Sequence, residues 1–221
     1  MTMDFLWHER PKPARGPKAA LTPAQITDVA IAIADAEGLG GLSMQRVAAE
    51  LGYTKMSLYR YFPDKSEMVA AMLERAIGTP PELSEAPDTG WRTALTGWAT
   101  ELLSRYLAHA WALEASVGDR PIGPHELGWM EVALKVLPGA LSGGERMDAV
   151  ATVAGHVRAI ASQKGGEAQL IQAMGLVLRE HADRFPAVAA AMADPGVPDQ
   201  AFGFGLERIL DGLEVLLRRR V

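Results

Sequence analysis

Apolar residues recur at every third or fourth position along most of the chain, in stretches that glycine and proline separate. The first stretch has the helical spacing i, i+3, i+4 and i+7, with Ile26, Val29, Ala30 and Ile33. It follows Thr22-Pro23, a pair that suits the start of a helix. Alternation of apolar and polar residues, which is typical of strands, is scarce. The pattern therefore predicts an all-α protein.

Two short helical patterns come next and lie close together. The first covers residues 43–51 and stops at Gly52, and the second covers 54–62 and ends against Pro63. Two helices joined by a tight turn that contains glycine are typical of a helix-turn-helix, whose second helix can lie in the major groove of DNA. A further apolar pattern predicts a helix that ends near Ile77.

The sequence GTPPELSEAPDTG at residues 78–90 interrupts the helical pattern and suggests a junction between two domains. Five further helical stretches follow it, at 91–117, 124–137, 144–163, 167–182 and 199–219. We therefore expect three parts: an N-terminal arm at 1–20, a helix-turn-helix domain at 21–77 and a larger helical domain at 88–221.

The composition and the absence of several motifs argue against several classes of function. The chain of 221 residues is 48% hydrophobic, enough for a sizeable core, and it has no cysteine, which excludes disulfides and thiolate metal sites. It contains no apolar run of the ~18 residues that a membrane helix needs, and its first residues lack the pattern of a signal peptide. We expect a cytoplasmic protein. No GxSxG motif, no phosphate-binding GK[ST] loop and no convincing metal-ligand cluster is present, so we expect neither an enzyme nor a metal or other cofactor.

Charge is distributed unevenly along the chain. The net charge is −5, yet residues 10–65 hold eight basic and five acidic residues, so this front part carries +3 and the remainder carries −8. A basic front on an acidic body suits a localised contact with DNA. The Pro-rich arm RPKPARGPK at 10–18 is expected to reach phosphates or a minor groove through Arg10, Lys12, Arg15 and Lys18, although a solvated tail is the alternative.

The second helix of the helix-turn-helix has an outer face without any acidic residue. If Leu58 and Phe62 point inward, the residues left to meet DNA are Thr54, Lys55, Met56, Ser57, Tyr59, Arg60 and Tyr61. Lys55 can donate to a guanine, and Met56 can pack on a thymine methyl group. Since the chain has no asparagine, a bidentate contact with adenine within this unit would fall to Gln45. Lys65, at the start of the following helix, suits a phosphate contact.

The stretch ADAEGLGGLSMQRVAAELGYTKMSLYRYFPDKSEMVAAML resembles the DNA-binding domain of the TetR family of repressors. The resemblance covers residues 22–75 and rests on GL-S before the helix at 43–51, on VAAELG at the turn, and on S-LYRYF-DK. The segments WHERPKPARGPKAAL and DQAFGFGLERILDGLEVLL are similar to the branch with a tetracycline-repressor-type C-terminal domain.

This resemblance implies a homodimer joined by a four-helix bundle, with a ligand pocket in each C-terminal domain. It also implies that Ser43, Gln45 and Arg46 lie in the DNA-contact region of the helix at 43–51. Thr54–Ser57, Tyr59 and Tyr61 would belong to the reading helix, and Lys65 would contact a phosphate. Tetracycline, magnesium and their contact residues are not carried over, because no metal-ligand cluster is evident.

Two apolar seams in the C-terminal part suggest how two chains could associate. Near-heptad spacing is typical of helices in a bundle, so we expect these seams to form the dimer interface. The alternative is that they face the core of their own chain. The predicted interface residues are Val150, Ala154, Val157, Leu206, Ile209, Leu213 and Leu217.

Four of the five tryptophans lie between residues 91 and 129. Aromatic walls with a few polar groups are typical of pockets for planar or apolar small molecules, although core packing explains such residues equally well. The predicted pocket residues are Trp98, Trp111, Trp129, Met130 and Met174.

Taken together, the sequence predicts a transcriptional regulator that binds a palindromic operator as a dimer and is released by a small-molecule effector. We interpret it as a repressor. An activator, or a regulator controlled by a protein partner, is the alternative.

Overall fold

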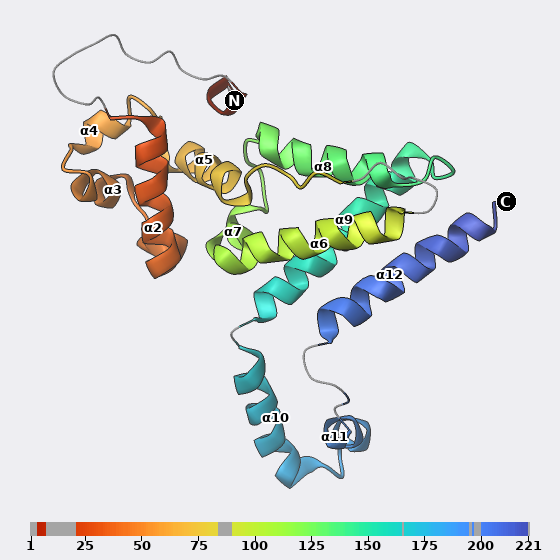
Figure 1. The fold of residues 1–221 in the computed structure, drawn as a ribbon. Coiled ribbons are helices and arrows are strands. Elements are labelled where there is room, and N and C mark those ends of the chain that lie inside the picture. The colour runs from red at the N-terminus through yellow and green to blue at the C-terminus, as the bar shows by residue number, and fades with distance from the viewer. Residues whose placement is uncertain are drawn as a thin grey trace.

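The computed structural model describes residues 4–7, 21–83, 90–164, 166–194, 196 and 200–220. These residues form helices and no strand, which confirms the predicted all-α class (Figure 1). The helices are α1 (Asp4–Trp7), α2 (Pro23–Gly41), α3 (Met44–Glu50), α4 (Lys55–Leu58), α5 (Lys65–Ile77), α6 (Trp91–Ala108), α7 (Trp111–Ala115), α8 (Pro124–Val136), α9 (Gly143–Gln163), α10 (Glu167–His181), α11 (Pro186–Ala193) and α12 (Ala201–Arg218).

Helices α2 to α5 form the N-terminal unit. Thr22 caps α2, since its side chain accepts from the Gln25 amide while the Gln25 side chain accepts from the Thr22 amide. Gly38, with φ of 72°, interrupts the regular helical conformation near the end of α2. Fully buried Ile26, Leu58 and Met68 join the unit's helices in one core.

Helix α4 is shorter than the sequence predicted. Its regular part spans only Lys55–Leu58. In place of the predicted continuation to Phe62 the chain forms turns, in which the amides of Tyr61 and Phe62 both donate to the Leu58 carbonyl. Gly52 precedes it with φ of 73°, a conformation that favours glycine and lets α3 turn sharply into α4.

Helix α5 is shared between the two halves of the molecule. It packs against α2 on one side and against α6, α7 and α8 on the other. Gly78 ends it with φ of 60°. The junction predicted at 78–90 therefore follows a helix that already belongs to both halves, and the domain limits remain a prediction.

The larger half is a layered bundle in which α9 packs between α6 and α12 (Figure 1). Arg92 of α6 joins α12 through Asp211 at 2.7 Å and Glu214 at 3.0 Å, while Arg220 pairs with Glu145 at the start of α9. The Arg220 guanidinium and the capping bonds with Ser142 lower the pKa of Glu145 to about 2, so this tie stays ionised well into acid.

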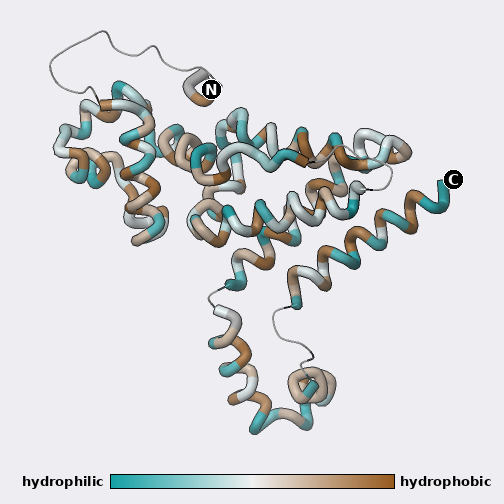
Figure 2. The backbone as a smooth tube through the Cα atoms, viewed as in Figure 1, coloured by the Kyte–Doolittle hydropathy of each residue, from teal (hydrophilic) through white to brown (hydrophobic). Residues whose placement is uncertain are grey.

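Helices α10 and α11 project away from this bundle (Figure 1). No residue whose burial is described in these two helices is buried. Leu170, Ile171, Leu176 and Val177 of α10 are exposed, and so is Phe185 just before α11. Figure 2 shows hydrophobic residues along this projection and along α12. Exposed apolar residues gathered in this way mark an interaction surface.

The predicted helix at 91–117 is divided in two. His109 leaves the helical conformation with φ of −133° and ψ of 76°, which separates α6 from α7. The short α11 was not predicted. No helix in the described ranges is both long and apolar enough to cross a membrane.

Candidate DNA-binding surface and effector cavity

Helix α3 presents its polar residues on the surface of the N-terminal unit. Ser43 is the N-cap of α3 and accepts a hydrogen bond from the Arg46 amide at 3.1 Å. Gln45 is exposed beside it, and the Arg46 guanidinium lies 3.2 Å from Glu37. Among the three residues predicted to contact DNA here, Ser43 and Arg46 have side-chain partners, whereas Gln45 has none among the described residues.

Helix α4 offers a surface of the kind predicted, although over one turn of helix rather than two. Thr54 is the N-cap residue, and its hydroxyl lies 3.0 Å from that of Ser57. Lys55 holds its ammonium group 5.4 Å from the centre of the Tyr59 ring. The Met56 side chain is 71% exposed, far more than a structural role for an apolar residue would require. Arg60 is exposed and Tyr61 is half-buried, and no acid interrupts the face.

Lys65 has a structural partner in addition to its predicted role. Its ammonium group donates to the Leu39 carbonyl at 2.9 Å and so ties the start of α5 to the end of α2. Because an ammonium group has three protons, this bond leaves donors for a phosphate. The basic residues of the predicted arm, Arg10, Lys12, Arg15 and Lys18, lie outside the described residues.

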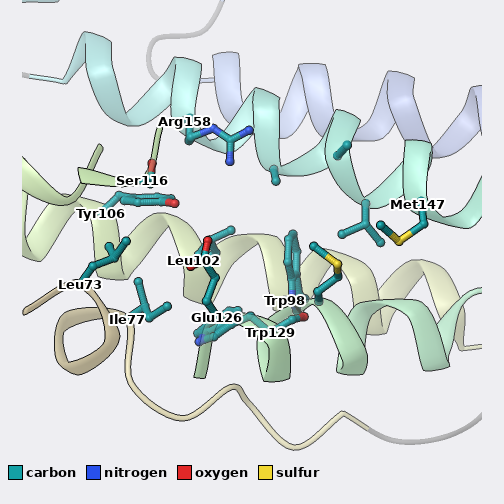
Figure 3. Close-up of a pocket in the computed structure, with 14 residues that line it drawn as sticks. Leu73, Ile77, Trp98, Leu102, Tyr106, Ser116, Glu126, Trp129, Met147 and Arg158 are labelled. Atoms are coloured by element: carbon teal, nitrogen blue, oxygen red, sulfur yellow. Dashed lines mark hydrogen bonds between the residues drawn. The ribbon is translucent and has the colours of Figure 1, made fainter. Parts of the chain in front are cut away.

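A cavity of about 230 Å³ lies inside the larger half, between α9 and the pair α6 and α8 (Figure 3). Trp98 donates from Nε1 to the Trp129 carbonyl at 2.8 Å, and the two rings meet edge to face with their centres 6.0 Å apart. This aromatic corner and Met130 line the cavity as predicted. The remaining apolar lining comes from Leu73, Ile77, Leu102, Met147, Val150, Ala151 and Ala154.

One end of the cavity is polar. Tyr106, Ser116, Glu126 and Arg158 line it (Figure 3). Glu126 is held by both guanidinium nitrogens of Arg120, one of them at 2.6 Å. The hydrogen bond that Arg120 donates to Glu126 is also the main cause that raises the pKa of Arg120. Sequence analysis missed this end, because each residue alone looks like an ordinary polar position on a helix.

Two predicted pocket residues do not line the cavity. Trp111 instead donates from Nε1 to the Asp35 carboxylate at 2.6 Å, and His109 Nδ1 lies 2.8 Å from the same oxygen. These bonds join α7 to α2 across the two halves of the molecule. Met174 lies on the projecting α10 and is half-buried there. The residue type alone therefore does not predict which tryptophans and methionines line the cavity.

Glu74 connects the cavity wall with the helix that both halves share. Its carboxylate accepts from the His125 amide at 2.8 Å and from the Glu126 amide at 3.0 Å, and so caps the start of α8 from outside that helix. A Cβ at Gly123 would overlap the Glu74 side chain, so glycine is required for this approach. Trp129 adds a bond from Nε1 to the Gly78 carbonyl at 2.9 Å. We call these contacts the Glu74 cap.

The predicted dimer seams face inward more than expected. Val150, Val157 and Leu206 are buried within their own chain, and Ala154, Ile209, Leu213 and Leu217 are partly buried against the same core. Heptad spacing identified the packing side of each helix but not what it packs against. The exposed sides carry different residues: Ala159 on α9, and Phe204 and Val215 on α12.

Within the described residues, no group of three or more His, Asp or Glu side chains is placed to hold a metal ion. The groups of the lining that can interact with a polar or aromatic ligand include the Trp98 and Trp129 rings, the Tyr106 and Ser116 hydroxyls and the Arg158 guanidinium.

Comparison with known proteins gives a consistent result. Residues 26–72 match the bacterial regulatory proteins of the tetR family, and residues 83–217 match the tetracyclin repressor-like C-terminal domain. The HTH-type transcriptional repressor DrrR1 of Streptomyces coeruleorubidus is 38% identical, over 99% of this chain and 87% of that protein. Tetracycline repressor protein class A from transposon 1721 of Escherichia coli is 28% identical, over 87% and 90% of the two chains.

Among solved structures, the TetR family protein ActR of Streptomyces coelicolor in complex with actinorhodin superposes with a TM-score of 0.76 at 26% identity. The match covers 89% of this chain and 96% of ActR. The domain match spans most of this chain, the family is one of transcriptional regulators, and the helix-turn-helix and the cavity lie where such a regulator needs them. The chain belongs to the TetR family of helix-turn-helix transcriptional regulators.

Proposed function

We propose that this protein represses transcription by binding a palindromic operator as a homodimer, and that a mainly apolar aromatic molecule in the cavity releases it. The observation that carries the proposal is the double role of α5. Leu73 and Ile77 of α5 line the cavity, while Met68 and Met72 of the same helix are buried in the N-terminal core. A ligand that presses on one part of this helix therefore acts on the other.

The Glu74 cap supports the same coupling. Since Glu126 and Trp129 line the cavity and also take part in the cap, a change in the cavity reaches the last turn of α5 through bonded contacts. Release of DNA depends on the difference between the effector's affinities for the two conformations, not on tight binding alone.

Filling the cavity should block the effector without disturbing DNA binding. Ala154 lines the cavity on α9, so an Ala154→Phe ring would occupy space that the effector needs. We expect fused-ring aromatic compounds to quench the tryptophan fluorescence of the native protein, because Trp98 and Trp129 line the cavity, and to have little effect on the variant. The matched control is Thr100→Phe, an exposed position on α6 outside the lining. Equal quenching of native protein and Ala154→Phe would contradict the proposal.

Substitution of Lys55 and of Lys65 should have different effects, because we expect Lys55 to contact a base and Lys65 to contact a phosphate. Lys55→Ala should reduce discrimination between the operator and unrelated duplexes by about 1–3 kcal/mol if Lys55 contacts a guanine. Lys65→Ala should weaken binding to all duplexes by a similar factor and lower the salt dependence, because it removes a phosphate contact. Fluorescence anisotropy with labelled duplexes at two salt concentrations measures both. If Lys55→Ala discriminated between operator and unrelated duplexes as well as the native protein does, Lys55 would not contact a base.

A further inference from the structure

The polar end of the cavity offers hydrogen-bond donors that none of the described residues uses. Arg158 projects from α9 into the cavity that Tyr106 and Ser116 also line (Figure 3). In the described part of the chain, no acidic side chain lies within ion-pair distance of Arg158, and no hydrogen bond involves the Tyr106 hydroxyl. Arg158 is half-buried, so part of the water that would otherwise solvate its charge is excluded.

The acceptors nearby are already occupied. Both carboxylate oxygens of Glu126 accept from Arg120, and that guanidinium also donates to the Ser116 carbonyl at 3.1 Å. The Ser116 hydroxyl donates to the Leu113 carbonyl at 2.9 Å. The Glu126 carboxylate is held by Arg120 and not by Arg158, so the Arg158 guanidinium remains available to a ligand at this end of the cavity.

The opposite end is apolar and aromatic. Trp98 and Trp129 form an aromatic corner there, and Figure 3 shows Met147 farther from Tyr106 than either ring. Met130 is also part of the apolar lining. A molecule that satisfied both ends would need a flat apolar body and an acceptor-rich anionic group at one edge. A guanidinium matches the geometry of a carboxylate better than that of any neutral acceptor, because two parallel N–H groups meet two oxygens.

We infer that the effector is an aromatic carboxylic acid, whose ring system lies against Trp98 and Trp129 and whose carboxylate pairs with Arg158 and accepts from the Tyr106 hydroxyl. This inference rests on the proposed function, since it names the class of molecule that the same cavity binds. It adds a specificity rule: the charge of the ligand, not only its apolar surface, decides affinity.

Matched pairs of probes test the rule. Anthraquinone-2-carboxylate and anthraquinone-2-carboxamide share one ring system, as do 2-naphthoate and 2-naphthamide, and each pair differs only in the charged group. Titration of tryptophan fluorescence at neutral pH should show that the native protein binds each acid at least about 10-fold more tightly than its amide. Arg158→Met should bring the acid to the affinity of the amide and leave the amide unchanged. Arg158→Lys should retain part of the preference, since it keeps the charge and loses the fork geometry.

One control variant and three possible outcomes separate the ways in which the inference could fail. Arg105→Met removes a guanidinium that pairs with Glu101 on α6 and does not line the cavity, so it should leave the preference intact. If the native protein binds acids and amides equally, the effector is not selected by charge and only this inference fails. If it binds neither while it still binds DNA, the effector cavity itself is refuted. If Arg158→Met becomes monomeric, Arg158 serves the contact between chains and the inference is overturned.

Discussion

A Phe204→Lys chain is expected to be monomeric in dilute solution and to bind its operator about 10²–10⁴-fold more weakly than the native protein, because linked half-site contacts gain about that factor. Phe204 is 63% exposed on α12, where the Arg208 guanidinium lies 5.4 Å from the centre of its ring. It lies on the outer side of a helix whose inner side holds Leu206 and Leu210 in the chain's own core. We propose that the exposed side of α12 around Phe204 packs against a second chain. A lysine there would place an ammonium group beside Arg208 in that interface, which is strongly unfavourable.

The variant leaves the core of the single chain intact, so circular dichroism should remain native while light scattering reports the mass of one chain. Leu127→Lys provides the control: Leu127 is a similarly exposed apolar residue, but on α8. It should stay dimeric and bind operator normally. A Phe204→Lys protein that remained dimeric would place the interface elsewhere, with the projecting α10 and α11 as the next surface to test.

Loss of the Glu74 carboxylate is expected to uncouple the effector from DNA. Glu74→Ala leaves the amides of His125 and Glu126 without their acceptor at the start of α8. From the known cost of losing a helix cap and of leaving buried donors unpaired, the free energy of unfolding should fall by about 2–4 kcal/mol. Effector and operator should each still bind, yet the ratio of operator affinities with and without effector should approach one.

The coupling is measured by operator titrations at zero and saturating effector, and the stability by thermal unfolding. Glu74→Gln keeps one acceptor oxygen and should lie between the native protein and Glu74→Ala in both measurements. Glu131→Gln, which alters a surface pair with Lys135 on the same α8, should change neither. Native coupling in Glu74→Ala would show that the signal reaches the N-terminal unit by another contact, such as that between Asp35 and Trp111.

The parts of the molecule that depend on local sequence were predicted well. Capping residues, glycines with positive φ and helical spacing of apolar residues specified α2, α3 and the turn into α4, because each acts within a few positions. The break between α6 and α7 was missed because His109 and Trp111 bond to Asp35, more than 70 positions earlier.

The cavity was only half predicted for a similar reason. Trp98 and Trp129 carry an obvious signal, but Arg158 becomes a cavity residue only when α6, α7 and α8 pack over α9. The apolar seams of α9 and α12 were also predicted only in part. Val150 and Val157 have the spacing of any packed helix, and spacing alone does not tell whether the surface opposite belongs to the same chain or to a second one.

The length of α5 determines how large a displacement a small tilt at the cavity produces at the other end of the helix. Its 13 residues span about 20 Å, at about 1.5 Å per residue. Ile77 at one end touches the cavity, while Lys65 at the other is bonded to Leu39 beside the reading surface. A tilt of about 6° about the cavity end moves the far end by about 2 Å over that helix length. Opposite tilts in the two subunits of a dimer change the separation of the reading helices by about 4 Å, more than the ~3.4 Å rise of one base pair. A rotation too small to disturb the packing of either core therefore moves one half-site out of register with the other.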